Sequence, residues 1–526
     1  MDELQGILER NVWDPRHDRE LTREQKKHPL HCKWVITPKV TPEGVFDKVK
    51  ARLVVLGNLQ TDDELLTKTR SPTPSLHTIF AQAAIAAATG RQVFTFDVGQ
   101  AFLNAQLQTQ GCDDIILQLS KQTADVLLEL DTSYKEFLRK DGTMRVKLNK
   151  ALYGLREAPK IWFDTIRAFF ILHRFVQSTL DECLFFKRYK DGRSIDVLLH
   201  VDDGKGTTDT PERAHHLLTA LKQQFKVLKV NQGNKHNYLS MVFEYNREDK
   251  TVNITMPTYA KKIVDSYETR ERGNPLTPHT PTLFKIQEST KLNSEDQGKF
   301  HSTVMRIMYY AQRVRPDILC TVNFLSTRTR LGTATLEDKD KLIRLVQFIN
   351  STHKDGITLG TDSSSEMRIF AYADAAYGVH MDGKSHTGLV ITFGRGPIYV
   401  KSCKQKCVTK SSCEAEIIAL SDIVATVAWM NDLLVELLGS TLPPVLMEDN
   451  KAAIQLVTNG ATTADRSRHV HIRNNFVFQF VDSGTMEIRH CPTDKMLADL
   501  LTKPLNTNTF LILREFLLGN KTAEQG

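Results

Sequence analysis

The sequence has few of the features that mark a secreted or membrane-bound protein. Its 526 residues include only 8 cysteines, and these follow no regular spacing, which predicts reduced thiols in an intracellular compartment rather than a disulfide framework. No continuously apolar run reaches about 18 residues, the length that crosses a bilayer, so we expect no membrane span. The opening stretch MDELQGILER is acidic and amphipathic, unlike a secretory signal. These absences favour a globular protein.

Internal repeats, low-complexity segments and a complete zinc motif are also lacking. Cys403 and Cys407 are closely spaced, but no second pair of Cys or His follows at zinc-ligand spacing, so thiols in a hairpin are the main interpretation and zinc the minor one. Charge is moderate, because 69 Lys and Arg against 62 Asp and Glu leave a net charge of +7. That balance fits a polyanionic partner, although a solvated basic surface has the same composition.

What the sequence does contain is a pair of acids after an apolar run. VLLHVDDGKG (Val197 to Gly206) sets Asp202 and Asp203 behind a segment, IDVLLHV, with the composition of a buried strand. Gly204 is expected to supply the turn. A buried carboxylate is costly without a partner, so the pair is expected to face a solvent cavity. From this stretch alone, a solvated hairpin turn is an equally good interpretation.

A third acid lies on a second predicted strand. In QVFTFDVGQAFL, alternation places Phe94, Phe96 and Val98 on one face and Asp97 on the other. Three carboxylates at strand ends can bind two Mg²⁺ ions, which clamp the attacking and leaving oxygens of a phosphoryl displacement. That the three acids meet in space is an assumption at this point.

A long helix is predicted near the C-terminus. SSCEAEIIALSDIVATVAWMNDLLVELLG repeats apolar residues at spacings of three and four. Ser411 and Glu414 form a candidate capping box, and Gly439 a C-terminal stop. Glu416 would lie in the first turns of this helix.

Further acids surround this helix in the sequence, one on a strand, one at a strand-to-helix junction and one on a helix. Each alone has the properties of a surface carboxylate, but together they form a second candidate two-metal site. The four members of this site are Asp374, Glu416, Asp449 and Asp499.

Four stretches in the first half resemble a known family. KWVITPKVTPEGVFDKVKARLVVLGNLQ, FDVGQAFLNAQL, LNKALYGLREAPKIWF and LLHVDDGKG resemble the successive polymerase motifs of copia-type LTR retrotransposon (Pseudoviridae) reverse transcriptases. The resemblance implies an α+β and α/β multidomain protein, with a right-hand polymerase of fingers, palm and thumb, a helical connection and a C-terminal ribonuclease H fold. It divides the chain into fingers and palm (1–245), thumb and connection (246–362), ribonuclease H domain (363–510) and a C-terminal tail (511–526).

The resemblance also implies roles for the seven acids. SSCEAE and LADLLTKPL resemble the ribonuclease H pattern of the same elements, in which the acids occur in the order Asp-Glu-Asp-Asp. Two Mg²⁺ or Mn²⁺ ions are implied at each site. The implied catalytic and metal-binding residues are Asp97, Asp202 and Asp203 for the polymerase, and Asp374, Glu416, Asp449 and Asp499 for the ribonuclease H.

Five further positions acquire substrate-binding roles from the motifs. Phe102 occupies the position of the aromatic gate that excludes a 2′-hydroxyl; a core phenylalanine is the alternative. Lys39 and Arg52 would pair with the incoming triphosphate, or else lie on an exposed basic hairpin. Tyr153 and Gly154 would line the nucleotide pocket.

Two positions depart from the family pattern. The family usually has Tyr before Val-Asp-Asp, where this chain has His200, which would stack or hydrogen-bond at the primer end. Ser240 stands in place of a usual glycine in the segment NYLSMVFEY. Normal primer handling and the shape of that hairpin are therefore in question. His490, upstream of Asp499, is a weaker candidate for product release.

The resulting hypothesis is an RNA- and DNA-directed DNA polymerase with ribonuclease H activity, which copies retrotransposon RNA into DNA and degrades the RNA of the hybrid. The implied partners are an RNA template, a DNA primer, RNA–DNA hybrid and dNTPs, with no membrane, and with a homodimer or the integrase of the same element as further options. The expected location is the cytoplasm, in a virus-like particle, or the nucleus. Two alternatives stay open: a domesticated, catalytically weakened nucleic-acid-binding descendant, and a nuclease whose polymerase has failed.

Overall fold

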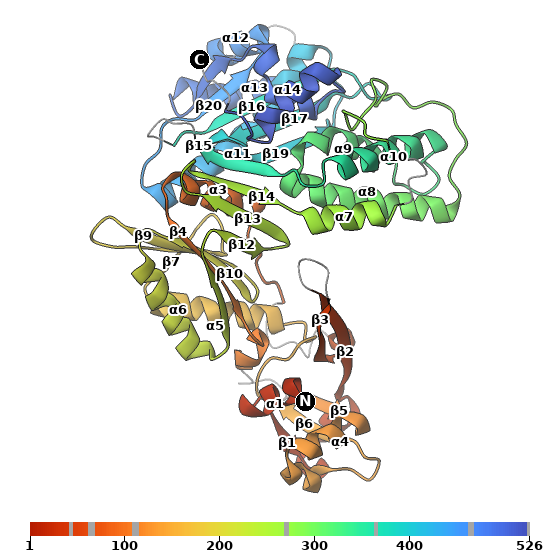
Figure 1. The fold of residues 1–526 in the computed structure, drawn as a ribbon, viewed down its shortest axis with the longest axis vertical. Helices are drawn as coiled ribbons and strands as arrows, with labels where there is room; N and C mark the ends of the chain where they lie inside the picture. The colour runs from red at the N-terminus through yellow and green to blue at the C-terminus, as the bar shows by residue number, and fades with distance from the viewer. Residues whose placement is uncertain are drawn as a thin grey trace. The chain divides into compact units, whose positions relative to one another are not determined.

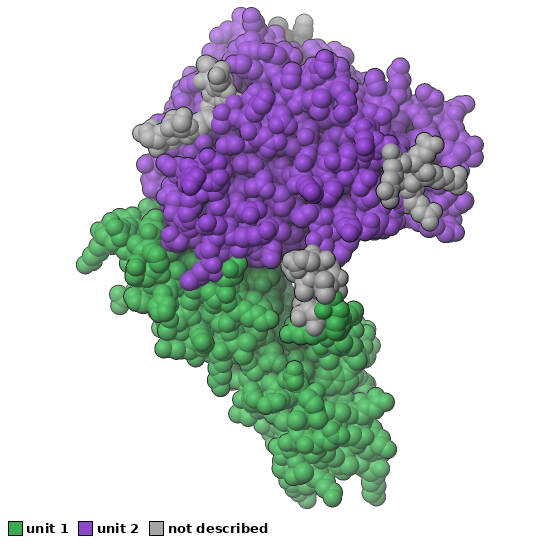
Figure 2. Space-filling view, in the orientation of Figure 1, with its two compact units in different colours: residues 1–74, 94–231 green, residues 75–93, 232–526 purple. Residues whose placement is uncertain are grey.

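The computed structural model describes residues 1–40, 46–60, 69–107, 115–267, 273–361, 367–460 and 468–522. Of Lys39, Val40, Asp47, Arg468 and His469 it describes the backbone alone. Two compact units divide the chain: unit 1 comprises residues 1–74 and 94–231, and unit 2 comprises residues 75–93 and 232–526 (Figure 2). Each candidate acidic site falls within one of these units.

The first sheet of unit 1 is built around a long hairpin. Strands β2 and β3 pair antiparallel over most of their length, from Cys32 opposite Val55 to Val40 opposite Phe46. The strand order is β1-β6-β5-β2-β3, and helices α1 and α4 lie beside this sheet (Figure 1). The elements are α1 (Asp2–Glu9), β1 (Trp13–Arg16), α2 (Arg23–Lys27), β2 (Leu30–Val40), β3 (Phe46–Val55), β5 (Ile116–Leu119), α4 (Lys121–Leu130) and β6 (Met144–Leu148).

The second sheet has the order β11-β4-β10-β9-β8-β7 and packs against helices α5 and α6 (Figure 1). The ring of Phe225 in α6 lies against Trp162 and Phe169 of α5, with ring centroids 5.2 and 5.5 Å apart. Aromatic burial of this kind is a large part of the core energy. The elements are β4 (Gln92–Val98), α5 (Ala158–Leu172), β7 (Val176–Gln177), β8 (Leu184–Arg188), β9 (Ser194–His200), β10 (Asp203–Thr208), α6 (Pro211–Phe225) and β11 (Leu228–Gln232).

The hairpin of β9 and β10 corrects the expectation that Gly204 forms the turn. His200 pairs with Asp203, so the two turn residues are Val201 and Asp202, and the positive φ (56°) belongs to Val201. Gly204 lies in β10, over the ring of Phe96, where a Cβ atom would approach the ring to 2.1 Å. The glycine therefore serves close packing and not the turn.

Unit 2 contains two further sheets. One has the order β12-β13-β14-β15-β18 and is covered by α3, and the other has the order β19-β17-β16-β20-β21 and packs against α11. The strands are β12 (Lys235–Tyr238), β13 (Met241–Asn246), β14 (Thr251–Thr255), β15 (Ile357–Thr361), β16 (Phe370–Ala376), β17 (His386–Thr392), β18 (Gly394–Arg395), β19 (Pro397–Lys404), β20 (Val445–Glu448) and β21 (Glu487–His490). The helices are α3 (Leu76–Ala88), α7 (Pro257–Asp265), α8 (Ser294–Val314), α9 (Leu319–Ser326), α10 (Leu336–Ser351), α11 (Ser412–Leu438), α12 (Lys451–Asn459), α13 (Arg468–Asp482) and α14 (Thr507–Leu517).

The predicted helix from Ser411 to Gly439 is present as α11. The Ser411 hydroxyl accepts from the Glu414 backbone N–H at 3.2 Å, and Gly439 ends the helix at φ 95°. In the expected capping box, the Glu414 carboxylate would accept from the N–H of Ser411. Instead, Glu414 Oε2 accepts from the N–H of Lys410, at 2.8 Å. By length and composition α11 could cross a membrane, although acidic residues interrupt its apolar sequence. However, 56% of the most apolar 18-residue stretch of α11 is buried inside the protein, as in a core helix.

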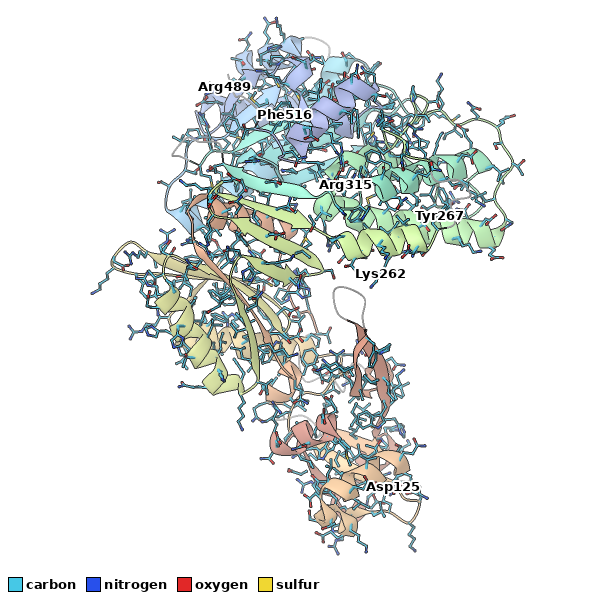
Figure 3. The ribbon with its side chains drawn as sticks, viewed as in Figure 1. Asp125, Lys262, Tyr267, Arg315, Arg489 and Phe516 are labelled. Carbon is cyan, nitrogen blue, oxygen red and sulfur yellow. The ribbon has the colours of Figure 1, made fainter. Side chains whose placement is uncertain are left out.

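A buried charge cluster joins α14 to the helices before it. Arg315, labelled in Figure 3, is fully buried. It donates from Nε and Nη2 to Asp317 Oδ1 and Oδ2 at 2.9 and 2.8 Å. Arg514 of α14 donates to Asp317 Oδ2 at 2.8 Å and to Asp355 Oδ2 at 2.5 Å. Although burial alone would raise it, these guanidinium groups hold the pKa of Asp317 at about 2. The cluster is a structural ion-pair network.

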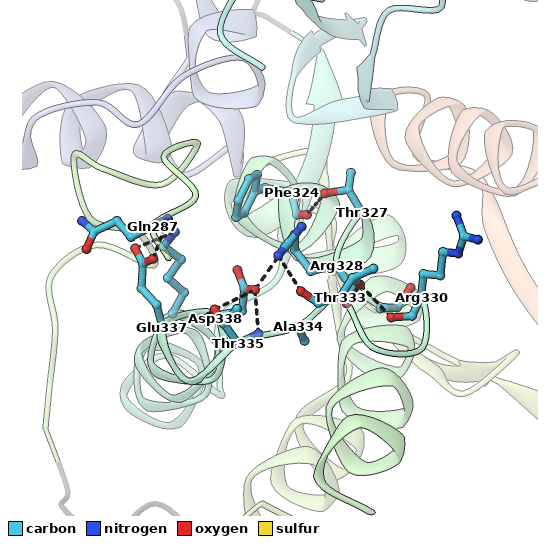
Figure 4. A network of polar contacts seen from close by, with 12 residues as sticks. Gln287, Phe324, Thr327, Arg328, Arg330, Thr333, Ala334, Thr335, Glu337 and Asp338 are labelled. Atoms are coloured by element: carbon cyan, nitrogen blue, oxygen red, sulfur yellow. Dashed lines mark hydrogen bonds and ion pairs between the residues drawn. The ribbon is translucent and has the colours of Figure 1, made fainter. Parts of the chain in front are cut away.

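A second network fixes the start of α10 (Figure 4). Thr335 caps the helix, and Asp338 Oδ2 accepts from the Thr335 N–H at 3.0 Å. Arg328, just after α9, donates to the same oxygen at 3.0 Å and to the Thr333 carbonyl at 2.5 Å. The cap therefore also ties α9 to α10.

The predicted four-part division meets elements that run across its boundaries. The boundary after residue 245 falls within β13, which continues in register with β14 as far as Asn246 opposite Thr251. The boundary after residue 510 falls within α14, whose Leu513 and Leu517 are buried. The division into functional domains stays a prediction.

Candidate active sites

The first acidic site (Asp97, Asp202 and Asp203) lies in unit 1, where β4 meets the β9–β10 hairpin. Asp97 is the second-to-last residue of β4, and the N–H of Val98 donates to the Asp202 carbonyl at 2.9 Å. Asp203 begins β10. All three side chains are half-buried. The structure therefore brings together, on adjacent strands, the three acids that the motifs assign to the polymerase.

The turn that carries Asp202 is held in a strained conformation. Val201 has a φ of 56°, a region that β-branched residues rarely adopt. The indole N–H of Trp162 in α5 donates to the Val201 carbonyl at 2.7 Å. Strain of this kind persists where the surrounding structure enforces it, and it is concentrated at functional sites.

Aromatic and basic side chains gather beside these acids. Phe102, on the short 3-10 helix η4 (Ala101–Asn104), contacts Tyr153 edge to face with centroids 5.1 Å apart. The guanidinium of Arg52, from β3, lies 5.1 Å from the centroid of the same Tyr153 ring. Burial, with the charges of Glu3, Asp202 and Asp97 nearby, raises the pKa of Tyr153 to about 12. Three of the predicted substrate-binding residues thus lie close together and near Asp97 and Asp202.

Gly154 is required by the close approach of two chain segments. Its φ is +95°, and a Cβ atom would come within 2.0 Å of the Val55 carbonyl oxygen. The Val55 N–H donates to the Tyr153 carbonyl at 2.7 Å. This contact fastens β3, and with it Arg52, to the segment that carries Tyr153.

The remaining predicted positions of this site are less informative. His200 is the last residue of β9, half-buried and paired with Asp203. The side chain of Lys39 lies outside the described part of the chain, so its triphosphate role stays a prediction. In the hairpin of β12 and β13, Leu239 and Ser240 both have positive φ, 51° and 66°. The two-residue turn thus forms without the family's glycine.

Electrostatics distinguish Asp202 within the first site. Burial raises the pKa of Asp202, and the neighbouring Asp97 raises it further, while Lys50 and Arg52 oppose the increase. Two cations on β3 therefore compensate part of the repulsion between the acids.

The second acidic site (Asp374, Glu416, Asp449 and Asp499) lies in unit 2. Asp374 is on the central strand β16, Glu416 in the second turn of α11, Asp449 directly after β20, and Asp499 on the 3-10 helix η8 (Leu497–Leu501). Gly388 pairs with Asp374 across β16 and β17. A Cβ atom on this glycine would lie 2.6 Å from the Ala498 carbonyl oxygen. The bare glycine therefore lets η8 reach Asp374.

Polar partners hold these acids in place. Lys503 Nζ lies 2.7 Å from Asp499 Oδ1 and 3.7 Å from Asp374 Oδ1. The Thr502 hydroxyl also donates to Asp374 Oδ2. Asp449 Oδ2 accepts from the Thr493 hydroxyl at 3.2 Å. The exposed His490 is close enough to act on the charge of Asp449.

A fifth acid, Glu448, lies in the second acidic site, although its sequence pattern did not predict a role there. It is fully buried, directly before Asp449, and its Oε1 accepts from the Asn450 N–H at 3.0 Å. The sequence alone does not distinguish Glu448 from an exposed acid next to Asp449. The burial of β20 shows that its side chain lies inside the protein. Trp162, Thr502 and Lys503 were also given no role, although they lie inside the quoted motifs.

Crowding of buried acids raises their pKa values. Burial raises the pKa of Glu416 well above its usual range, and Glu448, Asp374 and Asp449 raise it further. Burial and the charge of Asp374 raise the pKa of Asp499 to about 7, against the opposing effect of Lys503. So much negative charge in one buried place is stabilised by protons or by cations.

The donor atoms of the second site fit a divalent cation. One oxygen each of Asp374, Glu416 and Asp449 lies within 4.8 Å of the other two. Glu416 Oε2 is buried and has no hydrogen-bond partner. Carboxylate oxygens are the donors that Mg²⁺ and Mn²⁺ prefer. Among the described residues, this is the set of three Asp, Glu, His or Cys side chains whose donor atoms lie this close to one another.

With the two sites in place, the chain can be compared with known proteins. Residues 19–281, half of the chain, match the family model described as reverse transcriptase (RNA-dependent DNA polymerase). The chain belongs to the reverse transcriptase family. The matched range of the family contains Asp97, Asp202 and Asp203.

Relatives of the family extend beyond that range. The chain is 30% identical over 484 residues to the retrovirus-related Pol polyprotein from transposon RE1 of Arabidopsis thaliana, covering 91% of this chain and 31% of that protein. It is 27% identical over 497 residues to the polyprotein from transposon TNT 1-94 of Nicotiana tabacum, covering 93% and 36%. The copia-type resemblance drawn from the motifs is thereby confirmed. The chain spans about a third of the length of these relatives.

A solved structure supports the fold. A foamy viral protease–reverse transcriptase in complex with double-stranded DNA matches with a TM-score of 0.52 and 11% sequence identity, covering 93% of this chain and 68% of that one. At this identity the likeness concerns the fold alone. The predicted α+β multidomain polymerase fold is confirmed.

Proposed function

We propose that the chain is an RNA- and DNA-directed DNA polymerase with ribonuclease H activity, which copies the RNA of its retrotransposon into DNA and degrades the RNA of the resulting hybrid. The observation that carries the polymerase half is the gathering of Asp97, Asp202, Phe102, Tyr153 and Arg52 in unit 1. Family membership supports the same activity.

The ribonuclease H half rests on the second acidic site. Four acids at a central strand, a core helix, a strand end and a 3-10 helix converge, and three of them offer oxygens within 4.8 Å of one another. A pair of Mg²⁺ ions at each acidic site would activate the attacking oxygen and neutralise the leaving oxygen of a phosphoryl transfer. Asp97, Asp202 and Asp203 would hold the pair in unit 1, and the second acidic site the pair in unit 2.

The side chains of unit 1 then have distinct tasks. The Phe102 ring limits the space under the sugar of the incoming dNTP. Arg52 pairs with its phosphates, since an arginine fork suits phosphate oxygens. Tyr153 and Gly154 shape the nucleotide pocket, and His200 lies at the primer end. Lys39 is proposed to assist Arg52.

The proposed partners are nucleic acids, namely an RNA template, a DNA primer and the RNA–DNA hybrid. The foamy viral structure, whose partner is double-stranded DNA, and the basic net charge of +7 support this class of partner. A cytoplasmic virus-like particle or the nucleus as location, and a homodimer or an integrase as protein partner, are proposed from family resemblance alone.

The test is a dual-label assay that follows DNA extension and RNA fragments on one RNA template in a single tube. We expect Asp202→Asn to reduce DNA synthesis by about 100-fold or more while RNA cleavage continues, and Asp449→Asn to have the opposite effect, because a misplaced reacting group costs about that much. An Asp202→Asn protein that extends primers at the wild-type rate would overturn the polymerase half. Unchanged cleavage by Asp449→Asn would overturn the other half. Thermal unfolding of both variants separates these outcomes from misfolding.

A further inference from the structure

Unit 1 contains a cavity of about 1090 Å³ that none of the predicted site residues lines. Its walls come from α5, the residues after α1, the end of α6 and the segment before Tyr153. One wall of the cavity is polar and is formed by Arg10, Asn11, Asn104, Gln106, Lys150 and Lys226.

Three cations of this wall lack a carboxylate partner. Arg10 is 8% exposed, donates from Nη1 to the Gly6 carbonyl at 3.2 Å, and has a buried Nε without an acceptor. In the described part of the chain, neither Arg10, Lys150 nor Lys226 forms an ion pair. Burial and the charges of Arg10 and Lys226 lower the pKa of Lys150. Arg10 and Lys226 therefore both repel Lys150, and a bound anion would relieve that repulsion.

Two acids also line the cavity, Glu9 and Asp164. Asp164 pairs with Lys160 on the same helix, α5, and Glu9 accepts a hydrogen bond from Gln5 at 3.1 Å; among these described residues, neither acid forms an ion pair with the cations of this wall. The charges of Arg10, Lys150 and Lys226 exceed that of Glu9, so the wall keeps a net positive charge for a ligand.

The backbone places Lys226 at a cost. Its φ and ψ are 62° and −54°, and the Val227 N–H donates to the Phe225 carbonyl at 2.7 Å, which makes a γ-turn with positive φ at its centre. This turn is rare and strained. It is held by the Gly99 N–H, which donates to the Val227 carbonyl at 3.1 Å. Strain that is maintained in this way is a reason to look for a function.

We propose that this cavity binds a phosphate-bearing ligand, supplied by a free nucleotide or by a nucleic-acid strand. Arg10, Lys150 and Lys226 contact the phosphate oxygens, since charged donors bind them most strongly. The amides of Asn11 and Gln106, and the Oδ1 acceptor of Asn104, are available for base or sugar. The proposal does not depend on the polymerase proposal, because no acid of the first acidic site lines the cavity.

The ligand would also contact the element that carries Phe102. Asn104 ends η4, and its Nδ2 donates to the carbonyl oxygens of Gln100 and Ala101 at 3.2 and 3.3 Å. A ligand that binds Asn104 would therefore contact the 3-10 helix η4 itself, whose first turn Asn104 holds through these two bonds.

The test measures binding of two probes in EDTA, which removes metal-dependent binding at the acidic sites. Inorganic tripolyphosphate is titrated calorimetrically, and a short single-stranded RNA with a fluorescent label is followed by anisotropy. The variants are Lys150→Gln with Lys226→Gln, and the matched control is Lys190→Gln, an exposed lysine in unit 1 that does not line the cavity. We expect the double variant to lose about tenfold in affinity for at least one probe, with a smaller salt dependence, and the control to bind as the wild type does.

The two probes distinguish the source of the phosphate. A loss with tripolyphosphate assigns a free nucleotide, and a loss confined to RNA assigns a strand. Equal affinities of wild type, double variant and control for both probes would overturn the proposal, as would an absence of wild-type binding to either. Should the double variant unfold, each single lysine variant provides the same comparison, and Arg10→Gln extends it to the buried cation.

Discussion

The two acidic sites differ in how much of their geometry exists before a substrate arrives. In the second site, Asp374, Glu416 and Asp499 are at most 5% exposed, and the Lys503 ammonium already lies 2.7 Å from Asp499. In the first site the acids are half-buried, and the cations that influence them come from the β2–β3 hairpin. The second site is closed around the ammonium group of Lys503, whereas the first site stays open.

On the proposed function, this difference corresponds to what each site would accept. The open first site would leave room for a primer end and a nucleotide, so its selectivity would come from the surrounding wall, Phe102 and Tyr153. The closed second site would receive a backbone phosphate without reading a base, so its selectivity would lie in cation binding. We therefore expect changes around the first site to alter substrate choice and changes in the second to alter metal and proton binding.

The largest expected effect is on sugar selectivity in the open site. Phe102→Ala should reduce discrimination against ribonucleotides by about 100-fold, because space opens under the sugar. Single-nucleotide extension with dNTP and rNTP measures this, and hybrid cleavage by the same protein serves as the internal control. Equal rNTP use by wild type and variant would remove Phe102 from this role and weaken the contrast between the sites.

The next effect is on stability in the closed site. Asp499 has a pKa of about 7 in the folded protein and about 4 when unfolded. Because the folded pKa is the higher one, its stabilising contribution is complete below about pH 4 and is lost as the pH rises through about 7. In EDTA, the thermal midpoint of unit 2 should fall by several degrees over that window. Mg²⁺ should restore it, because metal replaces protons.

The matched variant for this experiment is Asp499→Asn, which should flatten the dependence of the midpoint on pH. A wild-type midpoint that rises between pH 4 and 7 in EDTA, with Mg²⁺ having no effect, would contradict the description of this site as a crowded acid cluster.

A smaller effect is expected from the departure at the primer end. His200→Tyr should extend primers at or above the wild-type rate, because a larger aromatic ring at the end of β9 offers more stacking area. Pre-steady-state extension of a matched primer measures it. A sharp loss of rate would instead give the histidine a role of its own and set this chain apart from its family.

The smallest effect concerns strained turns inside and outside the sites. Ser240→Gly should raise the free energy of unfolding by about 1 kcal/mol, since an exposed residue at φ 66° loses its left-handed penalty. Val201→Gly relieves a similar φ but removes a side chain that packs against the core, so it should gain less. Urea unfolding compares the two. A larger gain at Val201 would mean that its side chain contributes little to holding the first site.

The positions of the acids could be predicted because they occur in motifs with strong local signals. Asp97 lies near the end of a predicted period-two strand, and Glu416 lies shortly after the N-cap of a helix with a predicted apolar stripe; both the strand and the helix are present. Their chemical roles came from family resemblance, which the reverse transcriptase match supports over residues 19–281.

Other features depend on packing that a linear pattern does not encode. The rule that glycine makes the turn failed at Gly204, because the ring of Phe96 occupies the space of its Cβ atom while Trp162 holds Val201 in the turn. In the sequence Glu448 differs in no way from an exposed acid beside Asp449, and its part in the cluster follows from the burial of β20. The cations Arg10, Lys150 and Lys226 are far apart in the sequence, and only the fold brings them to one cavity.

The buried cluster around Asp317 has a consequence for how far the chain can be shortened. Asp317 shares its charge between Arg315 and Arg514, and Arg514 lies only 12 residues from the end of the 526-residue sequence. A version ending at the predicted boundary of residue 510 would keep every acid of both sites, yet leave a buried ion cluster with half of its positive charge. Helix α14 therefore holds the end of the described chain to the rest of unit 2 through Arg514, and a tag is better attached after this helix than before it.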